Sequence, residues 1–170
     1  RNIKCVGGVA VIEESKNVTL KNCVLHGSGF FGVLARKSAN VVVDGCAVAE
    51  CSFNVLIGEH SNRLVVQNSF LALNDGAYYG KDRKGLLIEA DNTEGIKLIQ
   101  NLVFRNKTSF LRKLNARDPR FTRNRFVAND FTPPDIIISP EGNRNWKSGP
   151  KTVKKLFQKN EYWPDPRVKE

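Results

Sequence analysis

Charged side chains recur at intervals of 23 residues and could gather on one face of the protein. Glu13, Arg36 and Glu59 keep this spacing, and Lys37 and His60 directly follow two of them. A base can remove the proton beside a substrate carboxylate once a cation neutralises that carboxylate. Arg36 as the neutralising cation, His60 as the base, and Lys37 or a loop tyrosine as the acid would meet these needs. The spacing therefore predicts a catalytic site for an acidic substrate.

Two other interpretations of this face stay open. Glu13 and Glu59 lie two repeats apart, which on neighbouring parallel strands means about 9.6 Å, a separation that suits an inverting hydrolase. Arg36 between them argues against that role, because it would hold both carboxylates ionised. Opposite charges on adjacent strands also stabilise an exposed parallel sheet without any catalysis.

These residues belong to a longer repeat. Asn22, Gly45, Asn68, Asn101 and Asn124 form one column with steps of 23, 23, 33 and 23 residues. Such a period indicates a stacked architecture. Further columns keep their character under the same steps: Cys23, Cys46 and Ser69; Cys5, Ser28, Cys51 and Asn74; Leu20, Val43, Val66 and Ile99; and Leu25, Val48, Leu71, Phe104 and Val127. A second turn column holds Ser15, Ser38 and Ser61 and, after the insertion, Asn92 and Asn115.

Short apolar runs within each repeat predict strands. Residues 9–12, 41–43 and 86–88 are rich in Val, Ile and Leu and are bounded by Gly, Asn or Ser. Two or three strands in 23 residues leave no room for a helix of ordinary length. The prediction is an all-β, single-stranded parallel β-helix, since the leucine pattern and helical half of a leucine-rich repeat are missing. A sandwich or another all-β fold is the remaining alternative.

The run at 17–25, Asn-Val-Thr-Leu-Lys-Asn-Cys-Val-Leu, and the run at 63–70, Arg-Leu-Val-Val-Gln-Asn-Ser-Phe, resemble the repeats of right-handed parallel β-helix proteins of the pectate-lyase-like superfamily. The resemblance covers residues 5–140 and implies about five to six right-handed coils. The superfamily includes polysaccharide lyases, glycoside hydrolases, uronate epimerases, tailspikes and non-enzymatic modules. It therefore implies an acidic polysaccharide as the partner of a lyase- or epimerase-like protein, with an adhesion or interaction module as the alternative.

The catalytic signatures of this superfamily are not matched. Asp118-Pro119-Arg120 shares only two residues with the Asp-Pro-His motif of alginate epimerases. The clustered aspartates of pectin hydrolases and the calcium-site aspartates of pectate lyases are also missing. No cofactor is therefore predicted with certainty, and Ca²⁺ stays an open alternative. The resemblance implies a secreted or cell-surface protein, and an intracellular location also stays open.

An insertion at 75–85 breaks the repeat and is bracketed by glycines. Insertions in solenoids emerge on one face, where ligands often bind. Aromatic planes can stack on sugar rings, and cations pair with carboxylates or sulfates. We expect the insertion and two basic residues of a later coil to bind substrate, through Tyr78, Tyr79, Lys81, Arg83, Lys84, Arg112 and Lys113. An ordinary solvated loop is an equal alternative for the insertion.

The C-terminal part has a different composition. Residues 1–140 are expected to form the coils, and 141–170 a linker followed by a short capping helix over 150–160. Trp146, Tyr162 and Trp163 are expected to pack at this end. The chain begins part-way through a repeat, so we expect a preceding portion, or a partner chain, to complete the first coil.

Charge and cysteine content limit the function classes. The net charge is +10, from 27 Lys+Arg against 17 Asp+Glu, which favours anionic partners. No nucleic-acid motif accompanies it and no apolar stretch is long enough to span a membrane. The cysteine spacing lacks a zinc pattern, and we interpret the cysteines as small core residues, with a Cys23–Cys46 bridge as the alternative.

Overall fold

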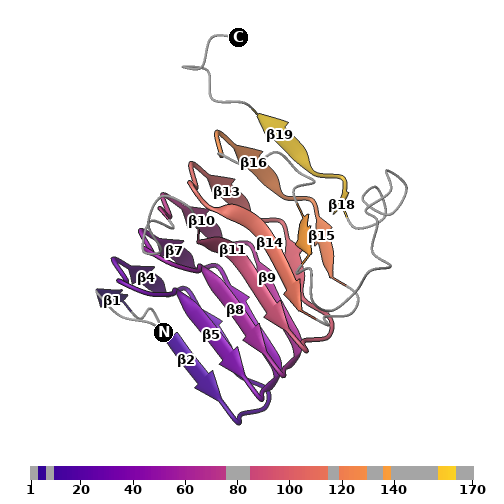
Figure 1. Cartoon of the computed structure of the whole chain (residues 1–170). Coiled ribbons are helices and arrows are strands. Elements are labelled where there is room, and N and C mark those ends of the chain that lie inside the picture. Colours follow the sequence, from indigo (N-terminus) through magenta and orange to yellow (C-terminus); the bar gives the residue numbers. More distant parts are fainter. Residues whose placement is uncertain are drawn as a thin grey trace.

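The computed structural model describes residues 4–6, 10–75, 85–114, 119–129, 136–138 and 157–163. Every regular element in these ranges is a strand, and every pairing between strands is parallel (Figure 1). The predicted all-β fold with stacked parallel strands is therefore confirmed.

The strands form three sheets. Sheet A has the order β1-β4-β7-β10-β13-β16-β19, with strands at Lys4–Val6, Val24–His26, Ala47–Ala49, Phe70–Ala72, Leu102–Phe104, Arg125–Val127 and Glu161–Trp163. Sheet B has the order β2-β5-β8-β11-β14-β17, with strands at Ala10–Glu13, Val33–Arg36, Leu56–Glu59, Leu86–Asp91, Ser109–Leu114 and Ile136–Ile138. Sheet C has the order β3-β6-β9-β12-β15-β18, with strands at Thr19–Lys21, Ala39–Asp44, Asn62–Gln67, Lys97–Ile99, Arg120–Thr122 and Phe157–Gln158.

Each coil of the chain visits sheets B, C and A in turn. Coil 1 consists of β2, β3 and β4, and the following coils continue in the same way to coil 6, which consists of β17, β18 and β19. The strand β1 precedes coil 1 in sheet A. This agrees with the predicted five to six coils.

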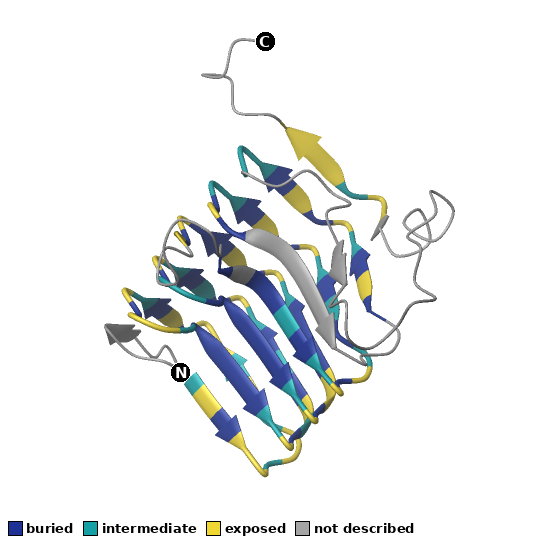
Figure 2. Cartoon of the chain, viewed as in Figure 1, coloured by how far each residue is buried: buried dark blue, intermediate teal, exposed yellow. Residues whose placement is uncertain are grey.

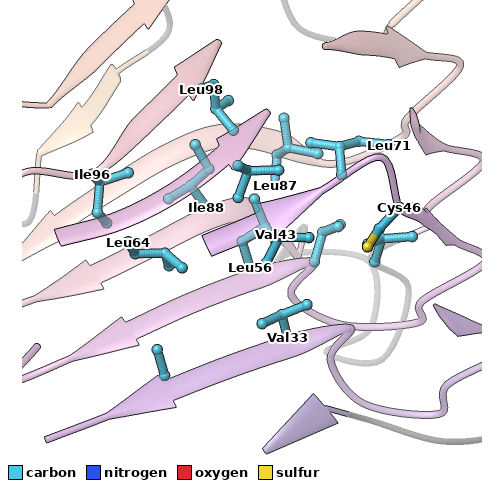
Figure 3. Close-up of a cluster of buried hydrophobic side chains, with 14 of the residues drawn as sticks. Val33, Val43, Cys46, Leu56, Leu64, Leu71, Leu87, Ile88, Ile96 and Leu98 are labelled. Carbon is cyan, nitrogen blue, oxygen red and sulfur yellow. The ribbon is translucent and has the colours of Figure 1, made fainter. Parts of the chain in front are cut away.

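The core lies inside the coil, between the three sheets. Side chains alternate along a strand, so each short strand directs one or two residues inward. Val33, Val43 and Val48, one from each sheet of coil 2, are fully buried. Figure 3 shows such side chains from successive coils stacked on one another, and Figure 2 shows the buried strands with exposed turns at their ends. Cys23, Cys46 and Cys51 are free and buried, as the core interpretation predicts.

Buried polar side chains at the turns form ladders along the coil axis. Asn101 donates a hydrogen bond from Nδ2 to Oδ1 of Asn124 at 3.0 Å, and Asn124 donates in turn to Oδ1 of Asn160 at 3.1 Å. Asn74 and Asn106 make the same contact at 2.7 Å in a second ladder. These side chains satisfy backbone groups where the chain bends, which buried turns require.

The predicted register is wrong by one residue after the insertion. Asn101 shares its column with Ser69, whose backbone N–H it accepts across 32 residues, and not with Asn68. Leu98 and Val103 accordingly occupy the inward columns that Ile99 and Phe104 were predicted to fill. A shift of one residue turns a side chain from the core to the outer face, which is why the buried leucine and valine decide the register.

Other predicted columns also differ by one residue after the insertion. Thr93, not Asn92, continues the column of Ser15, Ser38 and Ser61. In the apolar column, Phe126 replaces Val127. In the charged column, Asp91 pairs with Glu59. Asn124 continues the column of Cys23, Cys46 and Ser69, whereas Asn115 lies outside the described residues.

The predicted helix over 150–160 is wrong at its C-terminal end. Phe157–Gln158 is strand β18, which pairs with Phe121 and Thr122 of β15. Phe157 follows Phe121 in its column, and Asn160 continues the asparagine ladder. The described residues 157–163 therefore belong to a coil and not to a helix. Residues 150–156 and Trp146 lie outside the described residues. Of the two other aromatic residues expected to pack here, Tyr162 stacks on Phe126 at 5.3 Å between ring centroids, whereas Trp163 is 60% exposed.

Candidate functional site

Arg36 lies in a ladder of opposite charges on the outer face of sheet B. Its Nε donates to Oε2 of Glu59 at 2.6 Å, and its Nη1 donates to Oε1 of Glu13 at 3.3 Å. The hydrogen bond to Glu59 is the main cause of a raised pKa of Arg36, and the bond to Glu13 adds to it. The guanidinium is therefore held charged between two carboxylates of its own chain.

Lys37 and His60 lie at the next position, in the turn that follows β5 and β8. Both adopt a left-handed backbone with φ of 47°, as Glu14 does one coil earlier. Lys37 Nζ contacts Glu14 Oε1 at 3.3 Å, and His60 is exposed. The structure thus brings Arg36, Lys37 and His60 to one turn on consecutive coils, as the spacing predicted, and their catalytic role stays a prediction.

The structure argues against Glu13 and Glu59 as the paired carboxylates of an inverting hydrolase, for the reason expected from the sequence. Glu13 and Glu59 both bind Arg36, which stands between them. Glu59 is also next to Asp91 on the following coil, so this column carries three acids and one arginine in the order Glu13, Arg36, Glu59 and Asp91.

The predicted substrate-binding residues are only partly visible. Tyr78, Tyr79, Lys81, Arg83 and Lys84 lie outside the described residues. The backbone of Arg112 pairs with Glu89, and that of Lys113 with Ala90, in β14 and β11.

A second site, which the sequence analysis missed, lies where sheet C turns into sheet A. Two adjoining pockets of about 750 and 410 Å³ occupy the outside of this turn and share Gln100 and Leu102 in their lining. We call them together the CA groove. It runs along the coil axis past six successive coils. Figure 1 shows the row of strands β4, β7, β10, β13, β16 and β19, which supply the lining residues of the CA groove from sheet A.

Two columns of residues line the CA groove. One column holds the first turn residue of each coil, and all of these have a left-handed backbone: Asn22, Gly45, Asn68, Gln100, Arg123 and Lys159. The other holds the first outward residue of each sheet A strand: Val24, Ala47, Phe70, Leu102, Arg125 and Glu161. Both columns are uncharged over coils 1–4 and charged over coils 5 and 6.

The charged end combines cations with an exposed aromatic ring. Arg123 and Lys159 are exposed neighbours in the turn column, and no acidic side chain in the described part of the chain forms an ion pair with either. Arg125 Nε contacts Glu161 Oε2 at 2.9 Å. Trp163 lines the same pocket and is 60% exposed. The arrangement can therefore attract an anion and stack a planar or sugar ring.

A signal for this site exists in the sequence but depends on the correct register. Gln100, Arg123 and Lys159 each precede an asparagine of the ladder, so they must share one outward column. The register predicted from the sequence aligned Asn101 and Asn124 with Asn68, which assigned the ladder asparagines to the groove column. Arg123 and Lys159 were therefore not recognised as residues of that column.

No group of three or more potential metal ligands is found among the described residues, nor does that part of the chain hold a helix with the length and apolarity needed to cross a membrane.

A single chain that coils through three parallel sheets, with polar ladders inside its turns, defines the class of parallel β-helix proteins. A family model described as "Right handed beta helix region" matches residues 3–136, and the chain belongs to this family. The resemblance to right-handed parallel β-helix proteins is thereby confirmed. Comparison with curated proteins and with solved structures returned no match.

Proposed function

We propose that this β-helix domain binds an acidic polysaccharide at the charged end of the CA groove. The observation that carries the proposal is the pair Arg123 and Lys159, which stand on adjacent coils without an acidic partner among the described residues. Neighbouring parallel strands lie about 4.8 Å apart, and like charges at that distance repel one another. A chain of anionic groups laid across the two coils would remove this repulsion.

The rest of the pocket supports a sugar as the carrier of the anionic groups. Trp163 presents an exposed ring, and aromatic rings with one apolar face suit the C–H face of a sugar. Glu161 is the acidic residue in the lining, and Arg125 pairs with it. The guanidinium of Arg125 keeps further donors, since an arginine carries five N–H groups. A carboxylate or sulfate can therefore bind beside Glu161.

The proposal is tested by removing the two unpaired charges without changing the turn. Gln100 shows that glutamine fits this left-handed column, so Arg123→Gln with Lys159→Gln is the variant of choice. Arg120→Gln is the matched control, because Arg120 is an exposed cation of the same coil on the outer face of sheet C. Binding of alginate, pectate and a glycosaminoglycan is measured by calorimetry at low and moderate salt.

We expect the double variant to lose at least about tenfold in affinity, which corresponds to about 1.4 kcal/mol, and to show a weaker salt dependence. The control should bind as the unchanged protein does. Equal affinity of the double variant and the control would refute the assignment of this groove.

The alternative is a lyase or epimerase whose catalytic residues are Arg36, Lys37 and His60. It is supported by the position of these three residues at the same turn of consecutive coils. Its weakness is that Arg36 already binds two carboxylates. If this turn is catalytic, incubation with a uronic-acid polysaccharide should give an unsaturated or epimerised product, and His60→Ala should abolish it. Binding without any product would assign the protein to the non-catalytic modules.

A further inference from the structure

The CA groove changes in chemistry along its length. Over coils 5 and 6 its walls carry Arg123, Lys159, Arg125 and Glu161, whereas over coils 1–4 they carry amides, a glycine and apolar side chains. Both pockets share lining residues, so the two parts form one continuous surface.

The uncharged part is an exposed apolar row beside a row of amides. Val24, Phe70 and Leu102 are 38%, 37% and 38% exposed and share one column of sheet A. Phe70 and Leu102 lie on neighbouring strands, and Ala47 stands between Val24 and Phe70. Exposed apolar residues gathered in one row can mark a binding surface. Phe70 also stacks on Phe104 at 6.3 Å between ring centroids, so its ring is held as a platform. The walls here can offer apolar contact on one side and amide hydrogen bonds on the other.

A carboxylate would not be favoured over these coils. Asn68 Nδ2 donates to Asp44 Oδ1 at 2.9 Å, which places a carboxylate beside the turn column at coils 2 and 3. Among the described residues that line the smaller pocket, none is a cation. Like charges repel across such a short distance, so an uncharged sugar with hydroxyl groups and C–H faces fits this part better than a uronate.

We propose that the CA groove holds one polysaccharide chain lengthwise, with acidic sugars over coils 5 and 6 and uncharged or esterified sugars over coils 1–4. The ligand class is therefore a partly acidic polysaccharide, in which a charged block adjoins a neutral one. Equivalent positions recur at each coil about 4.8 Å apart, a spacing close to the length of one sugar, which favours a repeating polymer over a folded protein surface. This inference rests on the proposed acidic-polysaccharide binding and extends it to the neutral end.

The test uses oligogalacturonides of two, three and six sugars, either fully acidic or with methyl esters on the sugars at one end. Phe70→Ala removes the platform of coil 3, and Phe30→Ala is the matched control, since Phe30 is 52% exposed and does not line either pocket. Affinities are measured by calorimetry, and circular dichroism confirms that each variant is folded.

We expect affinity to rise with length, and the six-sugar chain with a neutral block to bind at least about threefold tighter than the fully acidic one. Phe70→Ala should remove that gain and leave the two-sugar affinity unchanged, and Phe30→Ala should change neither. If Arg123→Gln with Lys159→Gln weakens every oligomer while Phe70→Ala has no effect, the lengthwise arrangement is wrong and the charged site stands. If neither variant has an effect, both proposals fail.

The test gives a different result if a second copy of this chain, or another protein, binds to the exposed apolar residues Val24, Phe70 and Leu102. In that case Phe70→Ala would change the sedimentation of the protein without changing the affinity for any oligosaccharide. That outcome would overturn the lengthwise arrangement.

Discussion

Replacing Asn124 by alanine should destabilise the coil strongly, because its side chain links three successive coils. Asn124 is fully buried. Its Oδ1 accepts from the backbone N–H and from Nδ2 of Asn101 at 2.9 and 3.0 Å, and its Nδ2 donates to the carbonyl of Leu98 at 2.9 Å and to Oδ1 of Asn160. Alanine can replace none of these contacts.

The size of the stability loss follows from the buried polar groups that the substitution leaves without a partner. The buried N–H of Asn101 loses its acceptor, and the carbonyl of Leu98 loses the donor that Asn124 supplies. A buried polar group without a partner costs about 1–3 kcal/mol. The free energy of unfolding should therefore fall by about 2–5 kcal/mol, a large share of the stability of a domain of this size.

Urea unfolding followed by circular dichroism measures this loss as a lower midpoint. Asn160→Ala removes the half-buried neighbour in the last coil and should cost less, because water can reach the groups left behind. Asn62→Ala, at an exposed position of β9, is the matched control and should cost under about 0.5 kcal/mol. Asn124→Ser should recover part of the loss, since Ser69 fills this column in coil 3 and its Oγ accepts from the backbone N–H of Cys46 at 3.1 Å. Equal midpoints for Asn124→Ala and Asn62→Ala would refute the account of the ladder.

Three further predictions concern packing, pH and charge. Gly32→Ala should cost about 1–3 kcal/mol, because a Cβ there would clash with Val48 Cγ1 and lie 2.8 Å from the carbonyl oxygen of Val55. Gly29→Ala, with nothing within 4 Å of the added Cβ, should be nearly neutral in the same urea experiment. Burial raises the pKa of the Cys51 thiol from its usual 9.0 to about 12, so the fold favours the neutral thiol, and stability is lost as the pH rises through this window. Comparing unfolding free energy between pH 9 and 12 with that of Cys51→Ala should show an extra slope of at most about 1.4 kcal/mol per pH unit, and parallel curves would contradict it. Arg36→Gln should lower the urea midpoint only slightly, since water reaches both of its ion pairs, and added salt should shrink the difference. A loss that salt leaves unchanged would show that packing, not charge, is responsible.

The fold followed from the sequence because the repeat imposes it. Ser15, Ser38 and Ser61 predicted a turn column, and the backbone N–H of Ser15 and of Ser38 donates to the Oγ of the next serine. Columns of this kind need only a constant step and a constant residue type. The alternation of inward and outward side chains then placed Val43 and Val48 in the core.

The register beyond the insertion did not follow from the sequence. Asparagine occurs at both turn positions, in the exposed left-handed position as Asn68 and in the buried ladder as Asn101, so residue type alone allowed steps of 33 or 32. Side-chain hydrogen bonds and burial distinguish the two positions. The candidate site was affected by the same ambiguity, because the groove cations Arg123 and Lys159 are adjacent only in the correct register.

The amino-acid sequence by itself determined that the chain stacks valine-rich strands coil upon coil, with opposite charges at Glu13, Arg36 and Glu59 on one face. The tertiary structure alone decided which residues share a column after the insertion, that Phe157 and Tyr162 continue the coils, and that two unpaired cations lie beside an exposed tryptophan. The physical reason is that a period records a repeat along the chain, whereas the face on which a side chain lies depends on the position of each strand to a single residue.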